Sequence, residues 1–176
     1  SHPGRYCRPS GPLRPLFPEG FYNDTFIVSS VLSADTGNAS DLMGIVSASA
    51  ALLISDIPFH DPVGAVRVGR VGGAFVINPD IYQDGESDLN LVVAGTDEAI
   101  LMVEAGCREV PEETLLEAMD LAHAEIRKLI AIQKELQAKA GKVKRPLPEI
   151  HQDAEVVAKV EQLCLGSVRE ALLIAN

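Results

Sequence analysis

Tryptophan is absent from the 176 residues, and aromatic residues make up only 5% of them. Long apolar runs are missing as well, whereas a membrane helix needs about 20 consecutive apolar residues, so we expect no membrane association. The first residues also lack the apolar stretch of a secretory signal. Hydrophobic residues nevertheless form 47% of the chain, which is ample for a packed core and excludes a wholly disordered protein.

Cysteine is scarce: there are three, Cys7, Cys107 and Cys164. An odd number at wide spacing argues against a disulfide framework. The close pairs typical of a zinc site are also missing. The cysteines therefore predict a reducing compartment and a cytoplasmic location.

Lysine does not occur before residue 128, and the net charge is -10. Because phosphate neutralisation supplies most of the affinity for nucleic acids, a chain that grips them over its whole surface is usually basic. Residues 127–145, however, hold seven basic residues and one acid. Polyanion contact is expected there, unless these cations only complement the dipole of a helix end.

Hydrophobic periodicity predicts an α+β fold followed by a helical segment. Five prolines within residues 1–20 indicate an extended lead-in. The predicted strands are 24–33, 63–71, 74–77, 87–95 and 99–104, and the predicted helices are 40–54, 111–140 and 152–174. Gly72-Gly73 predicts a hairpin, and Ser40 or Asp41 is the expected cap of the first helix. The expected parts are 1–20, 21–140 and 141–176.

The longest helix is expected to pack one apolar face on the sheet around residues 89–93. The face is marked by Leu115, Met119, Ala122, Ile126, Leu129 and Leu136, and the side chains expected to pack on the sheet are Leu115, Met119, Ile126 and Leu129.

One acidic cluster is a candidate for chemistry. It comprises Asp80, Asp84, Glu86 and Asp88, which we place on a turn between two strands. Such carboxylates can hold Mg²⁺ or act as a general acid, although the spacing is not that of a calcium loop. The alternative is a solvated polar turn.

Seven sequence blocks, taken in order, resemble polynucleotide phosphorylase, a family of phosphate-dependent 3'-to-5' exoribonucleases. The blocks are 13–20, 47–52, 55–59, 64–69, 78–79, 88–96 and 99–104. The resemblance implies part of the first of two RNase PH-like cores (ribosomal protein S5 domain 2-like), followed by the start of an all-helical domain. Family members are several times longer, so the chain resembles a truncated piece.

The same resemblance implies a degenerate active site. The family's catalytic core uses a serine-rich turn to bind phosphate, two aspartates, a lysine and Mg²⁺. Here the turn falls at residues 39–41 and ends in Asp41, one aspartate is replaced by Asn90 and the lysine by Val92. Only Asp84 matches an acidic catalytic position. We therefore expect no catalysis, metal or cofactor in this chain, although the parent family uses Mg²⁺ and inorganic phosphate.

The resemblance further implies a role in ring assembly and RNA contact, because the family forms homotrimeric rings. The cations that we expect to contact RNA phosphates are Arg14, Lys139, Lys142, Lys144 and Arg145. A second interpretation is an RNA-binding or assembly module with no nuclease role of its own. A third is an unrelated small-ligand domain.

Overall fold

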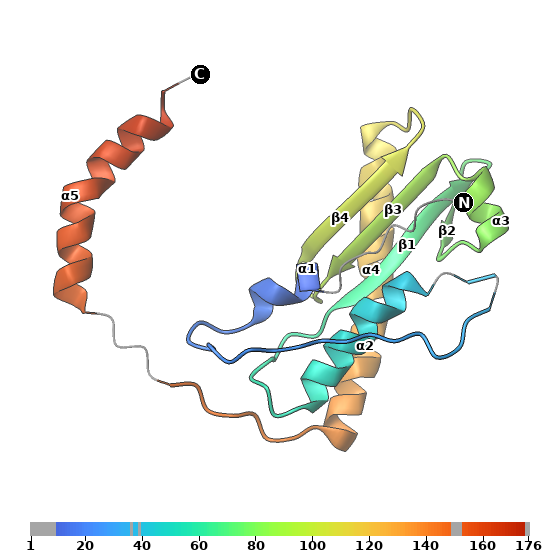
Figure 1. The fold of residues 1–176 in the computed structure, drawn as a ribbon. Coiled ribbons are helices and arrows are strands. Elements are labelled where there is room, and N and C mark those ends of the chain that lie inside the picture. Colours follow the sequence, from blue (N-terminus) through green and yellow to red (C-terminus); the bar gives the residue numbers. More distant parts are fainter. Residues whose placement is uncertain (1–9, 36, 39, 149–152, 175–176) are drawn as a thin grey trace. The chain divides into compact units, whose positions relative to one another are not determined.

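The computed structural model describes residues 10–35, 37–38, 40–148 and 153–174, and it divides into two units, Ser1–Pro146 and Leu147–Asn176. In chain order the first unit holds the helix α1 (Ser10–Leu13), a 3-10 turn (Arg14–Leu16), α2 (Asp41–Ile54), β1 (Gly64–Val71), β2 (Ala74–Ile77), α3 (Ile81–Glu86), β3 (Leu89–Gly95), β4 (Ile100–Cys107) and α4 (Glu112–Ala140) (Figure 1). The second unit holds α5 (Ala154–Leu172). Among the described residues, none of the helices combines the length and apolar character needed to cross a membrane.

The four strands form one antiparallel sheet in the order β2-β1-β3-β4. β1 and β2 are joined by Gly72 and Gly73, whose φ angles of 57° and 84° lie in the left-handed region that glycine adopts without strain. The predicted hairpin is therefore confirmed, and so is the α+β class.

One face of the sheet is covered by α4, which runs behind it in Figure 1. The fully buried side of α4 consists of Ala118, Ala122, Ile126, Ile130 and Gln133. Leu115, Met119 and Leu129 are half-buried beside this stripe, so the predicted packing is confirmed for these three and for Ile126. Leu136, which the sequence also placed on the apolar face, is 40% exposed.

The opposite face carries a second apolar cluster, which α2 closes. Ala65 of β1 and Val92 and Ala94 of β3 point to this side, since alternate residues of a strand face opposite sides. They meet a set of buried residues from α1, α2 and the loop after it, namely Leu13, Leu42, Ile45, Ala48, Leu52 and Phe59. The sheet is thus covered on both faces, and α2 sets the surroundings of the degenerate site.

The predicted strand 24–33 is wrong: this stretch is extended but belongs to no described sheet. A strand is defined by a hydrogen-bonded neighbour, and no backbone hydrogen bond joins these residues to the described part of the chain. Phe26 and Leu32 are consequently 90% and 95% exposed.

Two local features also differ from expectation. The acidic turn contains the short helix α3, because Asp80 and Gln83 form a reciprocal capping box at its start. The Asp80 carboxylate accepts a hydrogen bond from the Gln83 N–H at 2.8 Å, and the Gln83 side-chain oxygen accepts one from the Asp80 N–H at 3.1 Å. Ser40 occupies the N-cap of α2 without a side-chain hydrogen bond, whereas the Asp41 carboxylate accepts from the next backbone N–H. In the second unit Asp153 caps α5, and residue 152 of that predicted helix lies outside the described residues.

Candidate functional site

Asp41, at the start of α2, pairs with Arg67 of β1. The Arg67 guanidinium donates to Oδ2 of Asp41 at 2.6 Å. Both side chains are largely buried, with exposed fractions of 16% for Arg67 and 25% for Asp41. Directly opposite Arg67 in the sheet is Val92 of β3. The ion pair therefore lies beside the position at which the resemblance expects a lysine.

Asn90 and Asp84 form the second half of this site. The Asn90 amide donates to Oδ1 of Asp84 at 3.1 Å, so α3 is joined to β3 at this point. Asn90 lies two residues before Val92, hence on the same face of β3. The structure thus brings the four degenerate positions to one face of the sheet, while residue 39 of the expected turn lies outside the described residues.

The charge of this site does not favour an incoming phosphate. Arg67 is neutralised by Asp41, and Val92 is buried in the apolar cluster under α2. A phosphate about 4 Å from the Asp41 carboxylate would be repelled by roughly 4 kcal/mol at an effective dielectric constant near 20. The Nε of Arg67 is buried without a hydrogen-bond partner among the described atoms, so part of this cation's donor capacity is unused.

The carboxylates of the acidic cluster have different partners within the protein. Asp80 caps α3, Asp84 accepts from Asn90, and Asp88 lies 3.7 Å from Arg70. In the part of the chain that the structure describes, no group of three or more His, Cys, Asp or Glu side chains is placed to hold a metal ion. Asp80, Asp84 and Asp88 are thus each engaged with groups of the protein itself, as the polar-turn alternative expects.

The basic segment after α4 is bound to the end of α2. The Lys144 ammonium donates to three backbone carbonyls there, those of Leu52, Leu53 and Ser55, at 3.0, 2.8 and 2.8 Å. A cation at this end of a helix satisfies orphan carbonyls and the negative end of the dipole. Burial lowers the pKa of Lys144, while the nearby Asp56 opposes that shift.

Arg145 makes a further contact to the same region: its Nε donates to Asp56 Oδ2 at 2.6 Å. This hydrogen bond raises the pKa of Arg145 and lowers that of Asp56. Two of the five expected RNA contacts therefore have structural partners. The sequence suggested that the cations of residues 127–145 lie at the end of a helix. It did not show that Lys144 and Arg145 bind the end of α2, which lies far earlier in the chain.

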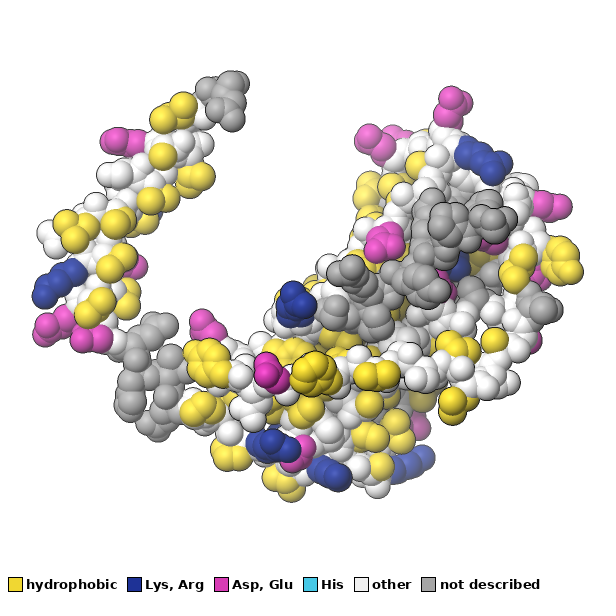
Figure 2. All heavy atoms as spheres, viewed as in Figure 1, with side chains coloured by type: hydrophobic (Ala, Val, Ile, Leu, Met, Phe, Trp, Pro, Cys, Tyr) yellow, Lys and Arg dark blue, Asp and Glu magenta, His cyan; other side chains and the backbone are white. Residues whose placement is uncertain are grey.

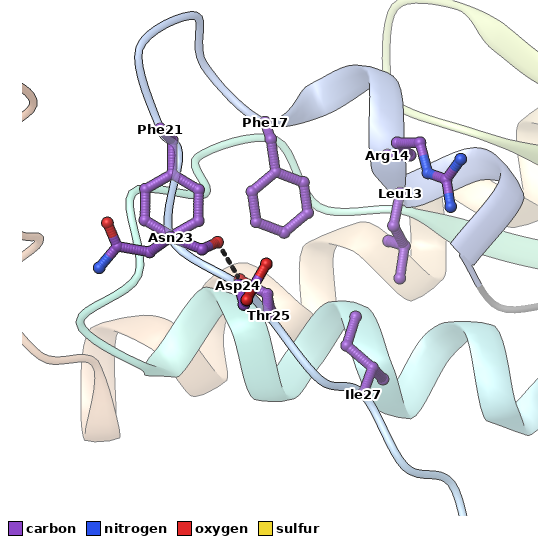
Figure 3. Close-up of a pocket in the computed structure, with 8 residues that line it drawn as sticks. All are labelled: Leu13, Arg14, Phe17, Phe21, Asn23, Asp24, Thr25 and Ile27. Carbon is purple, nitrogen blue, oxygen red and sulfur yellow. Dashed lines mark hydrogen bonds between the residues drawn. The ribbon is translucent and has the colours of Figure 1, made fainter.

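The other three expected cations, Arg14, Lys139 and Lys142, have exposed side chains with no ion pair in the described part of the chain. Arg14 borders a pocket of about 300 Å³ that also contains the stacked rings of Phe17 and Phe21, whose centroids are 5.7 Å apart (Figure 3). RNA binding by these residues stays a prediction.

The fold and sequence together define a class. Residues 61–125 match the model of the "3' exoribonuclease family, domain 2". The crystal structure of rice (Oryza sativa) Rrp46 superposes with a TM-score of 0.52 at 13% identity, covering 59% of this chain and 50% of that chain. The chain therefore has an RNase PH-like fold.

Within that class, the chain is related over most of its length to polyribonucleotide nucleotidyltransferases. It is 51% identical over 165 residues to the enzyme of Sulfurihydrogenibium sp., covering 94% of this chain and 24% of that protein. The enzyme of Heliobacterium modesticaldum is 47% identical over 161 residues, with 92% and 23% covered. That of Acidobacterium capsulatum is 55% identical over 134 residues, with 76% and 17% covered.

These relatives confirm the predicted resemblance to polynucleotide phosphorylase. The chain spans about a quarter of the length of the Sulfurihydrogenibium and Heliobacterium relatives.

Proposed function

We propose that this chain is a non-catalytic portion of a cytoplasmic phosphate-dependent 3'-to-5' exoribonuclease, serving ring assembly and RNA contact. In this proposal the phosphorolytic chemistry, with its Mg²⁺ and inorganic phosphate, belongs to other parts of the parent enzyme. The assembly is a homotrimeric ring, as in the family.

The observation that carries this proposal is the Asp41–Arg67 ion pair. A phosphorolytic site must gather donors and cations around the attacking phosphate and the scissile phosphodiester. Here the Asp41 carboxylate forms an ion pair with Arg67 and neutralises the positive charge of that side chain. Val92 offers no donor, and Asn90 cannot exchange a proton as a carboxylate would.

The test is phosphorolysis by the purified chain. We expect no nucleoside diphosphate when the chain is incubated with poly(A), inorganic phosphate and Mg²⁺. The complete enzyme of Heliobacterium modesticaldum serves as the positive control. Phosphate-dependent release of ADP that disappears in the Asp84→Ala variant would contradict the proposal.

RNA contact is tested through the three cations that have no ion pair with the described residues. We expect weak, salt-dependent binding, because phosphate contacts release counterions and are independent of sequence. Replacing Arg14, Lys139 and Lys142 by alanine should lower the affinity for a short single-stranded RNA. It should also flatten the slope of log K against log salt by about 2, since each phosphate contact contributes about 0.7.

The matched control is Lys128→Ala, because Lys128 is exposed but pairs with Glu125. It should leave the slope unchanged. Binding that is insensitive to salt, or equal in the triple variant and the control, would contradict RNA contact by these residues. In that event the part of the proposal that concerns assembly would stand alone.

The second candidate function, an assembly or RNA-binding module with no nuclease role of its own, shares these properties. It is distinguished by the genome neighbourhood: a nearby reading frame for a catalytic core would favour the enzyme portion.

A further inference from the structure

Residues 141–145, here called the strap, leave the end of α4 and run past the end of α2 (Figure 1). Gly141 begins the strap, and its N–H donates to the Gln137 carbonyl in the last turn of α4 at 2.7 Å. A side chain at this position would clash with that same carbonyl oxygen. Glycine therefore allows the close approach with which the chain leaves the helix.

Two backbone hydrogen bonds attach the strap to the end of α2. The Lys142 N–H donates to the carbonyl of Ile54 at 3.0 Å, and the Arg145 N–H donates to the carbonyl of Asp56 at 2.8 Å. Ile54 is the last residue of α2, so its carbonyl has no partner within the helix. The backbone of the strap is thus bonded to this helix end in addition to the side chains of Lys144 and Arg145.

The cations of the strap have different surroundings. The Lys144 ammonium donates to three carbonyls at the end of α2, and Arg145 pairs with Asp56. The Lys142 side chain, in contrast, is exposed and makes no ion pair with the described residues. Figure 2 shows Lys and Arg side chains gathered on this part of the surface, at the lower edge of the view. Two anchored cations therefore hold the stretch of backbone from which an exposed cation projects.

Such anchoring affects how strongly an exposed cation can bind a phosphate. A long side chain on a flexible backbone must be ordered when it binds, and this ordering lowers the affinity. A backbone that is already fixed before binding avoids part of that loss. Lys144 is two residues from Lys142, so the loss of its three hydrogen bonds would loosen the backbone that carries Lys142.

We propose that Lys144 is a positioning residue for RNA binding. It anchors the strap to α2 and thereby fixes Lys142 where that side chain contacts an RNA phosphate, and Lys144 itself does not contact the RNA. Lys142 and Lys144, which the sequence groups together, thus have different roles. This inference rests on the proposed function, because it requires that Lys142 binds RNA.

The first test is a double-mutant cycle on the affinity for a short single-stranded RNA at one salt concentration. Lys144→Met alone should weaken binding about two- to ten-fold. In the Lys142→Ala background it should have almost no further effect, because the side chain that it positions is absent. The matched control is the Lys139→Ala background. There Lys144→Met should keep its full effect, because Lys139 is part of α4 and not of the strap.

The second test examines the strap without RNA, through hydrogen exchange of backbone amides followed by NMR. The N–H of Lys142 donates to Ile54, so it should exchange more slowly than that of Val143, which makes no backbone–backbone hydrogen bond in the described part of the chain. Lys144→Met should accelerate exchange at Lys142. Lys139→Met, the control, should leave that rate unchanged.

The outcomes separate a failure of this inference from a failure of the proposed RNA contact. If Lys142→Ala leaves the RNA affinity unchanged, the contact is wrong and the positioning role falls with it. If Lys142→Ala weakens binding and the effect of Lys144→Met adds to it in full, the contact stands but Lys144 does not act through Lys142. The inference is also overturned if Lys144→Met binds RNA as tightly as the original protein, or if exchange at Lys142 is the same in both.

Discussion

Ser49 and Gln133 are 84 residues apart in the sequence, yet the Oγ of Ser49 donates a hydrogen bond to the Oε1 of Gln133 at 2.8 Å. Gln133 Nε2 in turn donates to the Val63 carbonyl at 2.9 Å, and the Val63 N–H donates to Ser49 Oγ at 2.8 Å. The cycle is buried and joins α2, α4 and the residue before β1. Since each of these groups has a partner, it fixes how the two helices pack beside the sheet.

Breaking this cycle should destabilise the fold. Gln133→Leu leaves the Ser49 hydroxyl and the Val63 carbonyl buried without their partner, and each such group costs about 1–3 kcal/mol. We expect the free energy of unfolding in urea to fall by about 2–4 kcal/mol. Glu135→Leu, at an exposed position of the same helix, should change it by less than about 0.5 kcal/mol. Equal effects of the two substitutions would contradict a structural role for the cycle.

The sequence predicted what local patterns encode. The hairpin follows from Gly72-Gly73, and α4 follows from apolar residues at helical spacing. Gln133 lies on the buried side of α4, but a polar residue does not contribute to a hydrophobic pattern, so its burial could not be predicted. Its hydrogen-bond partners are set only by the tertiary fold. The stretch of residues 24–33 was wrongly predicted as a strand for the converse reason: its alternating pattern is that of a strand, but a strand also requires a hydrogen-bonded neighbour.

The candidate site was predictable only in part. The resemblance identified Asp41, Asp84, Asn90 and Val92, and the structure places them on one face of the sheet. The partner of Asp41 was not predicted, because nothing in the spacing of residues 41 and 67 shows that a helix start and a strand meet. The role of Lys144 was missed for the same reason.

Lys144 should contribute to stability through the end of α2. Lys144→Met keeps most of the side-chain length but removes the donor to three carbonyls. Because water can replace part of these bonds at a half-buried site, we expect a loss of about 1–2 kcal/mol in unfolding free energy. Lys142→Met is the control, since the Lys142 side chain is exposed and has no ion pair with the described residues. No difference between the two variants would show that the carbonyls gain nothing from Lys144.

Asp97 gives a pH-dependent prediction. Its side chain accepts a hydrogen bond from Lys134 that lowers the pKa of Asp97, against a smaller opposing effect of burial. A carboxyl whose folded-state pKa is depressed contributes stability above its ordinary pKa of about 4. That contribution is lost as the pH falls through the folded value. Lys134→Met should therefore raise the pKa of Asp97 towards its ordinary value, as followed by NMR of the carboxyl carbon. Lys139→Met should leave it unchanged, and an equal shift in both variants would exclude a specific role for Lys134.

The last prediction concerns the Asp41–Arg67 pair. Asp41→Ser removes the carboxylate that neutralises Arg67 and leaves a largely buried cation without its partner. Breaking a buried pair in this way costs about 3–5 kcal/mol, less here because both side chains retain some exposure, so we expect a clear fall in melting temperature. Arg67 should then accept an anion, and inorganic phosphate should raise the melting temperature of Asp41→Ser in proportion to its occupancy. Phosphate should leave the melting temperature of the original protein almost unchanged.

The double variant Asp41→Ser, Arg67→Met is the control and should lose the phosphate response. Stabilisation by phosphate that is equal in all three proteins would mean that the ion acts elsewhere, and that Asp41 is not what keeps phosphate from Arg67.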